Sequence, residues 1–185
     1  GTTFFSNELP FYTIGENSIS ATINWMYMEN DPPIEHIDHY FYYDEKRFLD
    51  VFPQEEDTQF TSSHLVGTFS GNSSDVITFW YQPPACLHMV NHTWDRYNPD
   101  IPAYLRGMAE KYPNDFIHDQ GYSTATLKND PIFSDEDRNT FCYFYQKASL
   151  AAENMNWDTV VDMWNSLGSD ASITKQAHEL LPFIQ

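Results

Sequence analysis

The clearest alternation of apolar and polar positions lies in residues 18–28, SISATINWMYM. The segment is rich in β-branched and aromatic residues, and the apolar ones fall on every second position: Ile19, Ala21, Ile23, Trp25 and Tyr27. Successive side chains of a strand point to opposite faces, so this pattern predicts a strand. The breaker NDPP, Asn30 to Pro33, follows it.

Three further strands are predicted between residues 64 and 90. HLVGTFSG predicts a strand that ends in a turn at Ser70 to Asp75, VITFWY predicts a buried strand, and CLHMV predicts another. Pro83 and Pro84 cannot donate ladder hydrogen bonds, so they belong at a strand end or edge. These segments indicate a small mixed or antiparallel sheet.

The helical pattern is strongest toward the C-terminus. AYLRGMAEKY, residues 103–112, suits a helix, and three more are predicted over residues 139–155, 157–168 and 172–185. In these three, apolar residues recur at three- and four-residue steps: Phe141, Tyr145, Ala148, Ala152 and Met155, then Trp157, Val160, Val161, Trp164 and Leu167, then Ile173, Ala177, Leu180 and Leu181. The short links predict an antiparallel helical hairpin followed by a terminal helix.

The expected fold class is therefore α+β. We expect a sheet-containing region over residues 1–135 with flanking helices, and a helical region over residues 136–185 packed on it as one compact unit.

Charge narrows the choice of partners. The chain has 27 acidic and 9 basic residues, for a formal net charge of −18. Such a surface repels phosphate backbones and anionic membranes, so we expect no nucleic-acid partner. The longest apolar run is about six residues, far short of the roughly 20 that span a bilayer. The chain opens with Gly1, and we expect any membrane anchor or export signal to lie outside it.

The helical hairpin resembles a tetratricopeptide unit. The matching positions are Ala148, Ala152, Asn156, Trp157, Val160, Trp164 and Leu167. Met155 stands where the family has its turn glycine, and Val160 and Leu167 replace small alanines. Only about one repeat is visible, whereas a solenoid needs roughly three.

A longer resemblance covers about half of the chain. The order FSGNSSDVITFWYQPPACLHMV, IPAYLR, FCYFYQKASLAAENMNWDTVVDMW and LLPFI is similar to the soluble C-terminal domain of uncharacterised multi-pass bacterial membrane proteins. Their membrane spans distantly resemble those of glycosyltransferases that use polyprenyl-phosphate sugars. The family reads Y-x-P-P-G-C-L-R-V, where this chain has Ala85 for the glycine and His88 for the arginine. The resemblance implies an extracytoplasmic location.

The two cysteines, Cys86 and Cys142, allow three interpretations: a disulfide, two free thiols, or a nucleophile at Cys86 with His88 beside it. An extracytoplasmic domain favours the disulfide. It would close a long loop, which stabilises the fold by roughly 3–4 kcal/mol in the chain-entropy model. We also expect this bond to join the sheet to the helical hairpin.

Other candidate sites are few. Glu35, His36, Asp38 and His39 form a cluster that could hold a transition metal, against the simpler interpretation of a solvated polar segment. Trp94 and Tyr97 lie in the polar stretch NHTWDRYNPD and are candidate ligand contacts. No P-loop, GxGxxG, GxSxG or HExxH motif is present, and we expect no cofactor.

These features predict a monomeric, non-catalytic accessory or binding domain of a membrane protein, which contacts a glycan or a protein partner. The alternative is a hydrolase or transferase that uses Asp or Glu together with His36 or His88. A catalytic domain should gather titratable side chains in a pocket, whereas a binding domain should expose an apolar patch.

Overall fold

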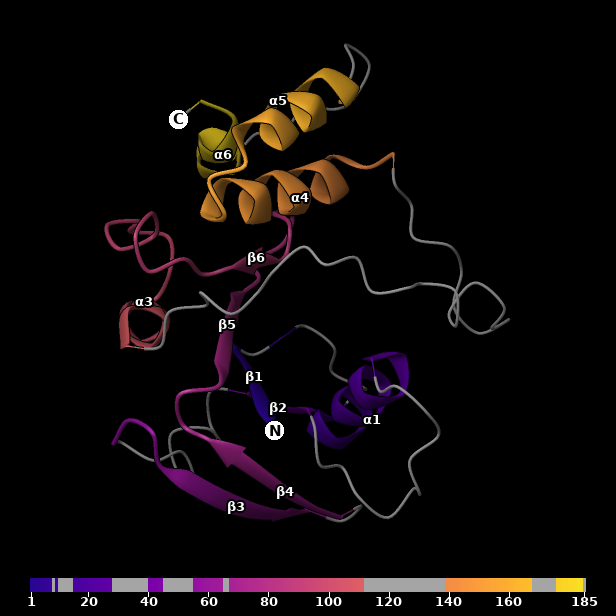
Figure 1. The fold of residues 1–185 in the computed structure, drawn as a ribbon, viewed down its shortest axis with the longest axis vertical. Coiled ribbons are helices and arrows are strands. Elements are labelled where there is room, and N and C mark those ends of the chain that lie inside the picture. The colour runs from indigo at the N-terminus through magenta and orange to yellow at the C-terminus, as the bar shows by residue number, and fades with distance from the viewer. Residues whose placement is uncertain are drawn as a thin grey trace. The chain divides into compact units, whose positions relative to one another are not determined.

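The computed structural model of the chain describes residues 1–7, 9, 15–27, 40–44, 55–64, 67–111, 139–167 and 176–184. The chain divides into two compact units (Figure 1). The first contains Gly1–Trp80 and Met89–Asn114, and the second contains Tyr81–His88 and Asp115–Gln185. The predicted regions, residues 1–135 and 136–185, stay a prediction; the short segment Tyr81–His88 groups with the second unit.

The larger sheet has four strands in the order β2-β1-β5-β6, of which β1, β2 and β5 belong to the first unit. β1 (Thr2–Ser6) is parallel to both of its neighbours, β2 (Tyr40–Asp44) and β5 (Val76–Trp80). β6 (His88–Met89) is shorter than the strand predicted from CLHMV. β5 confirms the strand predicted from VITFWY, and four of its five residues are buried.

Helix α1 (Glu16–Tyr27) follows β1, and the strand predicted for residues 18–28 is therefore wrong. Among the side chains of α1 that the structure describes, residues 16–24, the buried ones are polar: Ser20 and Asn24, four positions apart on one face of the helix. The alternating residues Ile19, Ala21 and Ile23 stay exposed or half-buried. The apolar residues that alternate in the sequence therefore lie next to the buried face of the helix, which carries the hydroxyl of Ser20 and the amide of Asn24.

These two polar side chains bind the backbone of β2. The Asn24 Nδ2 atom donates to the Tyr40 carbonyl oxygen at 2.6 Å, and the Tyr40 N–H donates to Asn24 Oδ1 at 3.1 Å. The Tyr42 N–H donates to Ser20 Oγ at 2.9 Å. Since β1 occupies the other side of β2, α1 lies along the side of this strand that no described strand pairs with.

An antiparallel hairpin of β3 (Gln59–His64) and β4 (Gly67–Asn72) forms a second sheet. β4 accounts for most of the predicted HLVGTFSG strand, and the chain turns between Asn72 and Val76 as expected. Phe69 of β4 is fully buried, with its ring centroid 5.6 Å from that of Phe41 and 6.4 Å from that of Tyr43. The hairpin thus contributes to the core of the first unit.

That core covers one face of the four-stranded sheet. Alternate residues of β1, β2 and β5 meet Phe69 of the hairpin and one side of helix α3 (Ala103–Lys111). The buried cluster consists of Phe5, Phe41, Tyr43, Phe69, Val76, Trp80, Val90, Ile101, Leu105 and Ala109.

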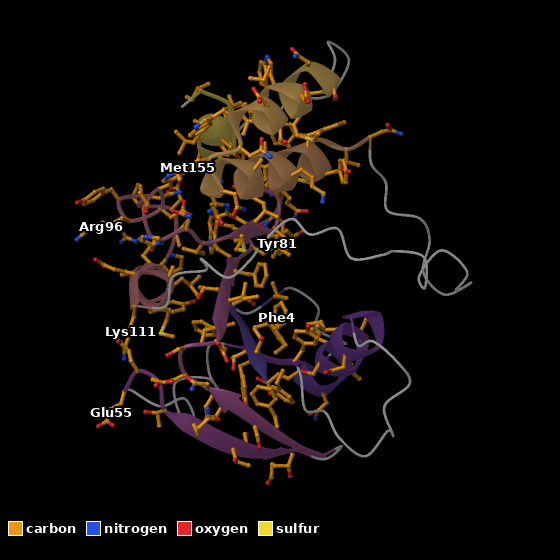
Figure 2. The ribbon with its side chains drawn as sticks, viewed as in Figure 1. Phe4, Glu55, Tyr81, Arg96, Lys111 and Met155 are labelled. Carbon is orange, nitrogen blue, oxygen red and sulfur yellow. A yellow bond between two sulfur atoms is a disulfide. The ribbon has the colours of Figure 1, made fainter. Side chains whose placement is uncertain are left out.

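The second unit contains the predicted helical hairpin, α4 (Phe141–Glu153) and α5 (Trp157–Ser166). The Asn156 N–H donates to the Ala151 carbonyl oxygen at 2.8 Å, and the Met155 N–H donates to that of Ala152 at 2.9 Å. Met155, labelled in Figure 2, has a φ of 55°, so these two bonds end α4 in a Schellman motif. Asn156 then caps α5 by accepting the Thr159 N–H.

The terminal helix is shorter than predicted and differs in its buried side. It comprises a 3₁₀ segment, η2 (Ala177–Leu180), and one turn of α-helix, α6 (Leu181–Ile184). Glu179 and Pro182 are buried, whereas Ala177 is exposed and Ile173 lies outside the described residues. A 3₁₀ helix has about three residues per turn, which brings positions 179 and 182 to the same side.

Together, the sheets and helices confirm the predicted α+β class. Among the residues that the structure describes, none of the helices combines the length and apolarity needed to cross a membrane.

Candidate functional site

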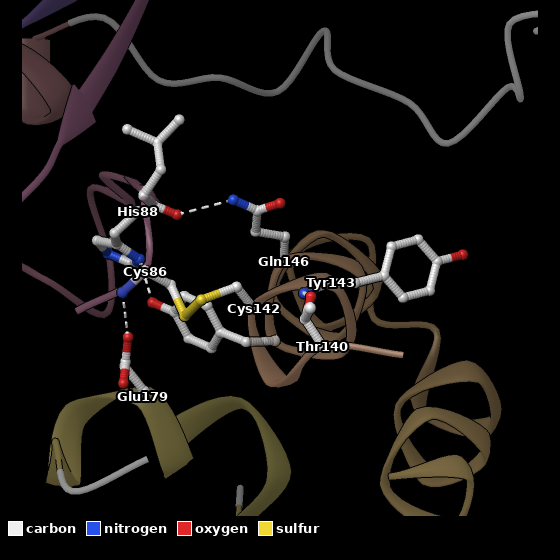
Figure 3. Close-up of a disulfide and its surroundings, with 9 residues drawn as sticks. Cys86, His88, Thr140, Cys142, Tyr143, Gln146 and Glu179 are labelled. Atoms are coloured by element: carbon white, nitrogen blue, oxygen red, sulfur yellow. Dashed lines mark hydrogen bonds between the residues drawn. A yellow bond between two sulfur atoms is a disulfide. The ribbon is translucent and has the colours of Figure 1, made fainter. Parts of the chain in front are cut away.

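Cys86 and Cys142 form the predicted disulfide, with their Cα atoms 5.3 Å apart (Figure 3). Cys86 lies two residues before β6, and Cys142 lies in α4, so the bond connects the chain next to a sheet strand with the hairpin. The bond fixes the segment Tyr81–His88 onto the first turn of α4. With both cysteines in this bond, neither offers a thiolate nucleophile.

Glu179, on η2, also holds the segment Tyr81–His88 in place. This side chain is only 1% exposed, and its Oε1 atom accepts a hydrogen bond from the Cys86 backbone N–H at 2.6 Å. A carboxylate acceptor makes this bond stronger than one between neutral groups. This hydrogen bond joins η2 to Cys86. The segment Tyr81–His88, the hairpin helix α4 and the terminal helix are therefore all connected at Cys86 (Figure 3).

Replacing Glu179 by alanine should lower the free energy of unfolding by about 1–3 kcal/mol, because the Cys86 N–H loses its acceptor in a buried place. Glu179→Gln keeps an acceptor oxygen and should lose less. Urea denaturation measures the stability, and hydrogen exchange at the Cys86 amide reports the bond itself. An Ala variant with unchanged stability and unchanged Cys86 exchange would contradict this role.

His88, one of the two histidines named in the catalytic alternative, also packs against α4. It is buried, and its Nδ1 atom is hydrogen-bonded to the hydroxyl of Tyr145 on α4. Gln146 donates from Nε2 to the Leu87 carbonyl oxygen at 3.1 Å. The segment is therefore attached to α4 by two side-chain hydrogen bonds in addition to the disulfide.

The outer side of α5 carries a row of exposed apolar side chains. Trp157, Val161 and Trp164 are 44%, 55% and 45% exposed and occupy positions i, i+4 and i+7. The Trp164 ring contacts Phe183 of α6, with centroids 5.3 Å apart, and Ile184 beyond it is 71% exposed. Trp157, Val161, Trp164 and Ile184 are called the α5 surface below.

The five apolar positions predicted at helical spacing in 157–168 do not share one environment. Only Val160 and Leu167 are buried. At 3.6 residues per turn, the apolar positions from Met163 round to Val161 span about 160° of the helix, more than one packing contact covers. The width of this arc is the signal in the sequence that indicates a second, outward apolar side. Met155, which stands at the position of the tetratricopeptide turn glycine, is exposed in the α4–α5 turn.

The other predicted ligand contacts lie in the loop between β6 and α3. Trp94 is half-buried, and its backbone N–H donates to Asn91 Oδ1 at 3.0 Å, whereas Tyr97 is 81% exposed. The group that stacks on the Tyr97 ring is the Arg96 guanidinium, 5.5 Å from the centroid, and Arg96 also pairs with Glu110 at 3.1 Å. The role of these two aromatic residues as ligand contacts stays a prediction.

The predicted metal ligands Glu35, His36, Asp38 and His39 fall outside the described residues. Within the described part of the chain, no three His, Cys, Asp or Glu side chains gather in a way that could hold a metal ion.

Comparison with known proteins adds no relative. A scan of protein families, a search of curated proteins and a search of solved structures each found no match to this chain. The α5 surface and the disulfide-linked segment are therefore interpreted from their own geometry.

Proposed function

We propose that this chain is a non-catalytic binding domain that contacts a protein partner through the α5 surface. The observation that carries the proposal is the exposure of Trp157, Val161 and Trp164 at helical spacing. A row of apolar residues at i, i+4 and i+7 matches the way in which helices recognise one another. Tryptophan is also enriched among the residues that dominate binding energy at interfaces.

The local framework suits a binding surface. The helix α5 is capped by Asn156 and packed on α4, and α6 contacts Trp164 through Phe183. The disulfide fixes the segment Tyr81–His88 onto α4, and Glu179 fixes η2 onto the same segment, which supports a preorganised framework around α5. A rigid surface loses less conformational entropy when it binds.

The location that we propose is extracytoplasmic, as part of a membrane protein whose spans lie outside this chain. The Cys86–Cys142 bond supports this, because disulfides persist in oxidising compartments and are rare in the cytosol. The resemblance to domains of multi-pass bacterial membrane proteins supports the same location.

Binding is favoured over the catalytic alternative by the state of His88. Its ring is buried and hydrogen-bonded to Tyr145, so a substrate has little access to it. A glycan contact would instead use the exposed ring of Tyr97, which offers a matched comparison for the α5 surface.

A synthetic amphipathic helix of about 18 residues tests the proposal. The peptide should carry leucines at i, i+4 and i+7 and equal numbers of Lys and Glu elsewhere. In NMR titrations of the ¹⁵N-labelled chain, we expect shifts of the Trp157 and Trp164 indole N–H signals. The variant Trp157→Ala/Val161→Ser should bind at least about tenfold more weakly, since such anchors dominate interfaces.

Tyr97→Ala serves as the control, because it removes an equally exposed aromatic ring from the first unit. Trp164 is left in place because its contact with Phe183 is structural. Absence of binding, or shifts centred on Tyr97 that vanish in Tyr97→Ala, would overturn the proposal.

A further inference from the structure

The acidic residues of α5 lie on one flank of the exposed apolar row. Asp158 and Asp162 are exposed and four positions apart, so their side chains point to the same side of the helix. With about 100° between successive residues, this flank is roughly 120° from the apolar row. The opposite flank is the one that packs, since it carries Val160 and Leu167.

Building on the proposed function, we infer that the partner of the α5 surface is an amphipathic helix with basic side chains beside its apolar row. An apolar row would cover Trp157, Val161 and Trp164, and Lys or Arg would lie opposite Asp158 and Asp162. Complementary charges of this kind set the register and the choice of partner at helix–helix contacts.

Charge also argues against the other occupants of this surface. An antiparallel pair of α5 helices from two copies of the chain would bring the two Asp158–Asp162 rows together, and like charges repel. An anionic membrane surface would be repelled in the same way, and the net charge of −18 adds to the effect. A basic helix, in contrast, would be attracted by both carboxylates of this flank, Asp158 and Asp162.

Two peptides of about 18 residues provide the test. Both carry the same leucine row, and the flanking positions are all Lys in one and all Glu in the other. At about 0.15 M salt, the Lys peptide should bind at least about fivefold tighter than the Glu peptide, since each exposed ion pair adds a modest amount. Both should shift the Trp157 and Trp164 indole signals.

A variant separates local pairing from the attraction of any cation to an acidic protein. Asp158→Asn/Asp162→Asn should lower the affinity of the chain for the Lys peptide by about three- to tenfold. Glu55→Gln/Glu56→Gln removes the same charge from an exposed loop of the first unit and should leave the affinity unchanged.

The outcomes distinguish the two proposals. If neither peptide reaches the α5 surface, the proposed function fails. If both peptides bind there equally, the surface stands and the basic partner is wrong. An equal loss from the Asp pair and the Glu pair would likewise overturn the inference, because the attraction would then be general. Self-association that competes with the peptide would identify a second copy as the occupant.

Discussion

Replacing both Cys86 and Cys142 by alanine is expected to lower the free energy of unfolding of the helical unit by roughly 3–4 kcal/mol. The two residues are 56 positions apart, and the bond removes much of the freedom of the unfolded chain between them. The folded state also loses the attachment of a segment that belongs to the core cluster of Cys86, Phe141, Tyr145 and Leu167. Urea denaturation monitored by circular dichroism measures the loss.

Reductant provides the control for this prediction. The native chain in reductant should resemble the double alanine variant, and reductant should not destabilise the variant further. The protein must be produced under oxidising conditions, so that the bond can form. Equal urea midpoints for the oxidised chain and the variant would show that the bond contributes nothing to stability.

Phe69→Ala is expected to lower the stability of the first unit by about 3–5 kcal/mol, the usual cost of removing a large buried aromatic side chain. Phe69 is completely buried, and its ring meets those of Phe41, Tyr43 and Phe60. The cavity left by the ring would lie where the β3–β4 hairpin joins the core. Urea denaturation again measures the change.

Two variants calibrate this result. Phe69→Leu retains most of the apolar volume and should cost about 1–1.5 kcal/mol. Thr68→Ala changes the exposed neighbour on the same strand and should stay within about 0.5 kcal/mol of the native chain. If Phe69→Ala costs no more than Thr68→Ala, the hairpin is not part of the core.

The helical hairpin could be predicted because its information is local. The three- and four-residue spacing in α4 places Phe141, Tyr145 and Ala148 on one buried side. The pairing of the cysteines was equally accessible, since there are only two. The attachment of the segment around Cys86 to the hairpin was accessible as well, but its grouping with the second unit was not, because the chain leaves the first unit after Trp80 and re-enters it at Met89.

The first unit was harder to predict because its contacts are distant in sequence. β1 pairs with strands that begin at Tyr40 and Val76, and no local pattern reports such partners. Helix α1 was mistaken for a strand because its contacts with β2 use Ser20 and Asn24 in place of apolar residues. Glu179 had no signal either, since only the fold reveals that a carboxylate in an apolar segment is buried.

The contacts between α1 and β2 also restrict how this domain can meet other molecules. The outer strand of a sheet normally invites an extended peptide to add itself as a further strand, by domain swapping, aggregation or regulated recognition. In β2, the amide of Asn24 already occupies both the N–H and the carbonyl of Tyr40, and Ser20 occupies the N–H of Tyr42. An incoming strand would have to displace a helix to gain the same hydrogen bonds. Recognition by strand addition is therefore closed at this edge.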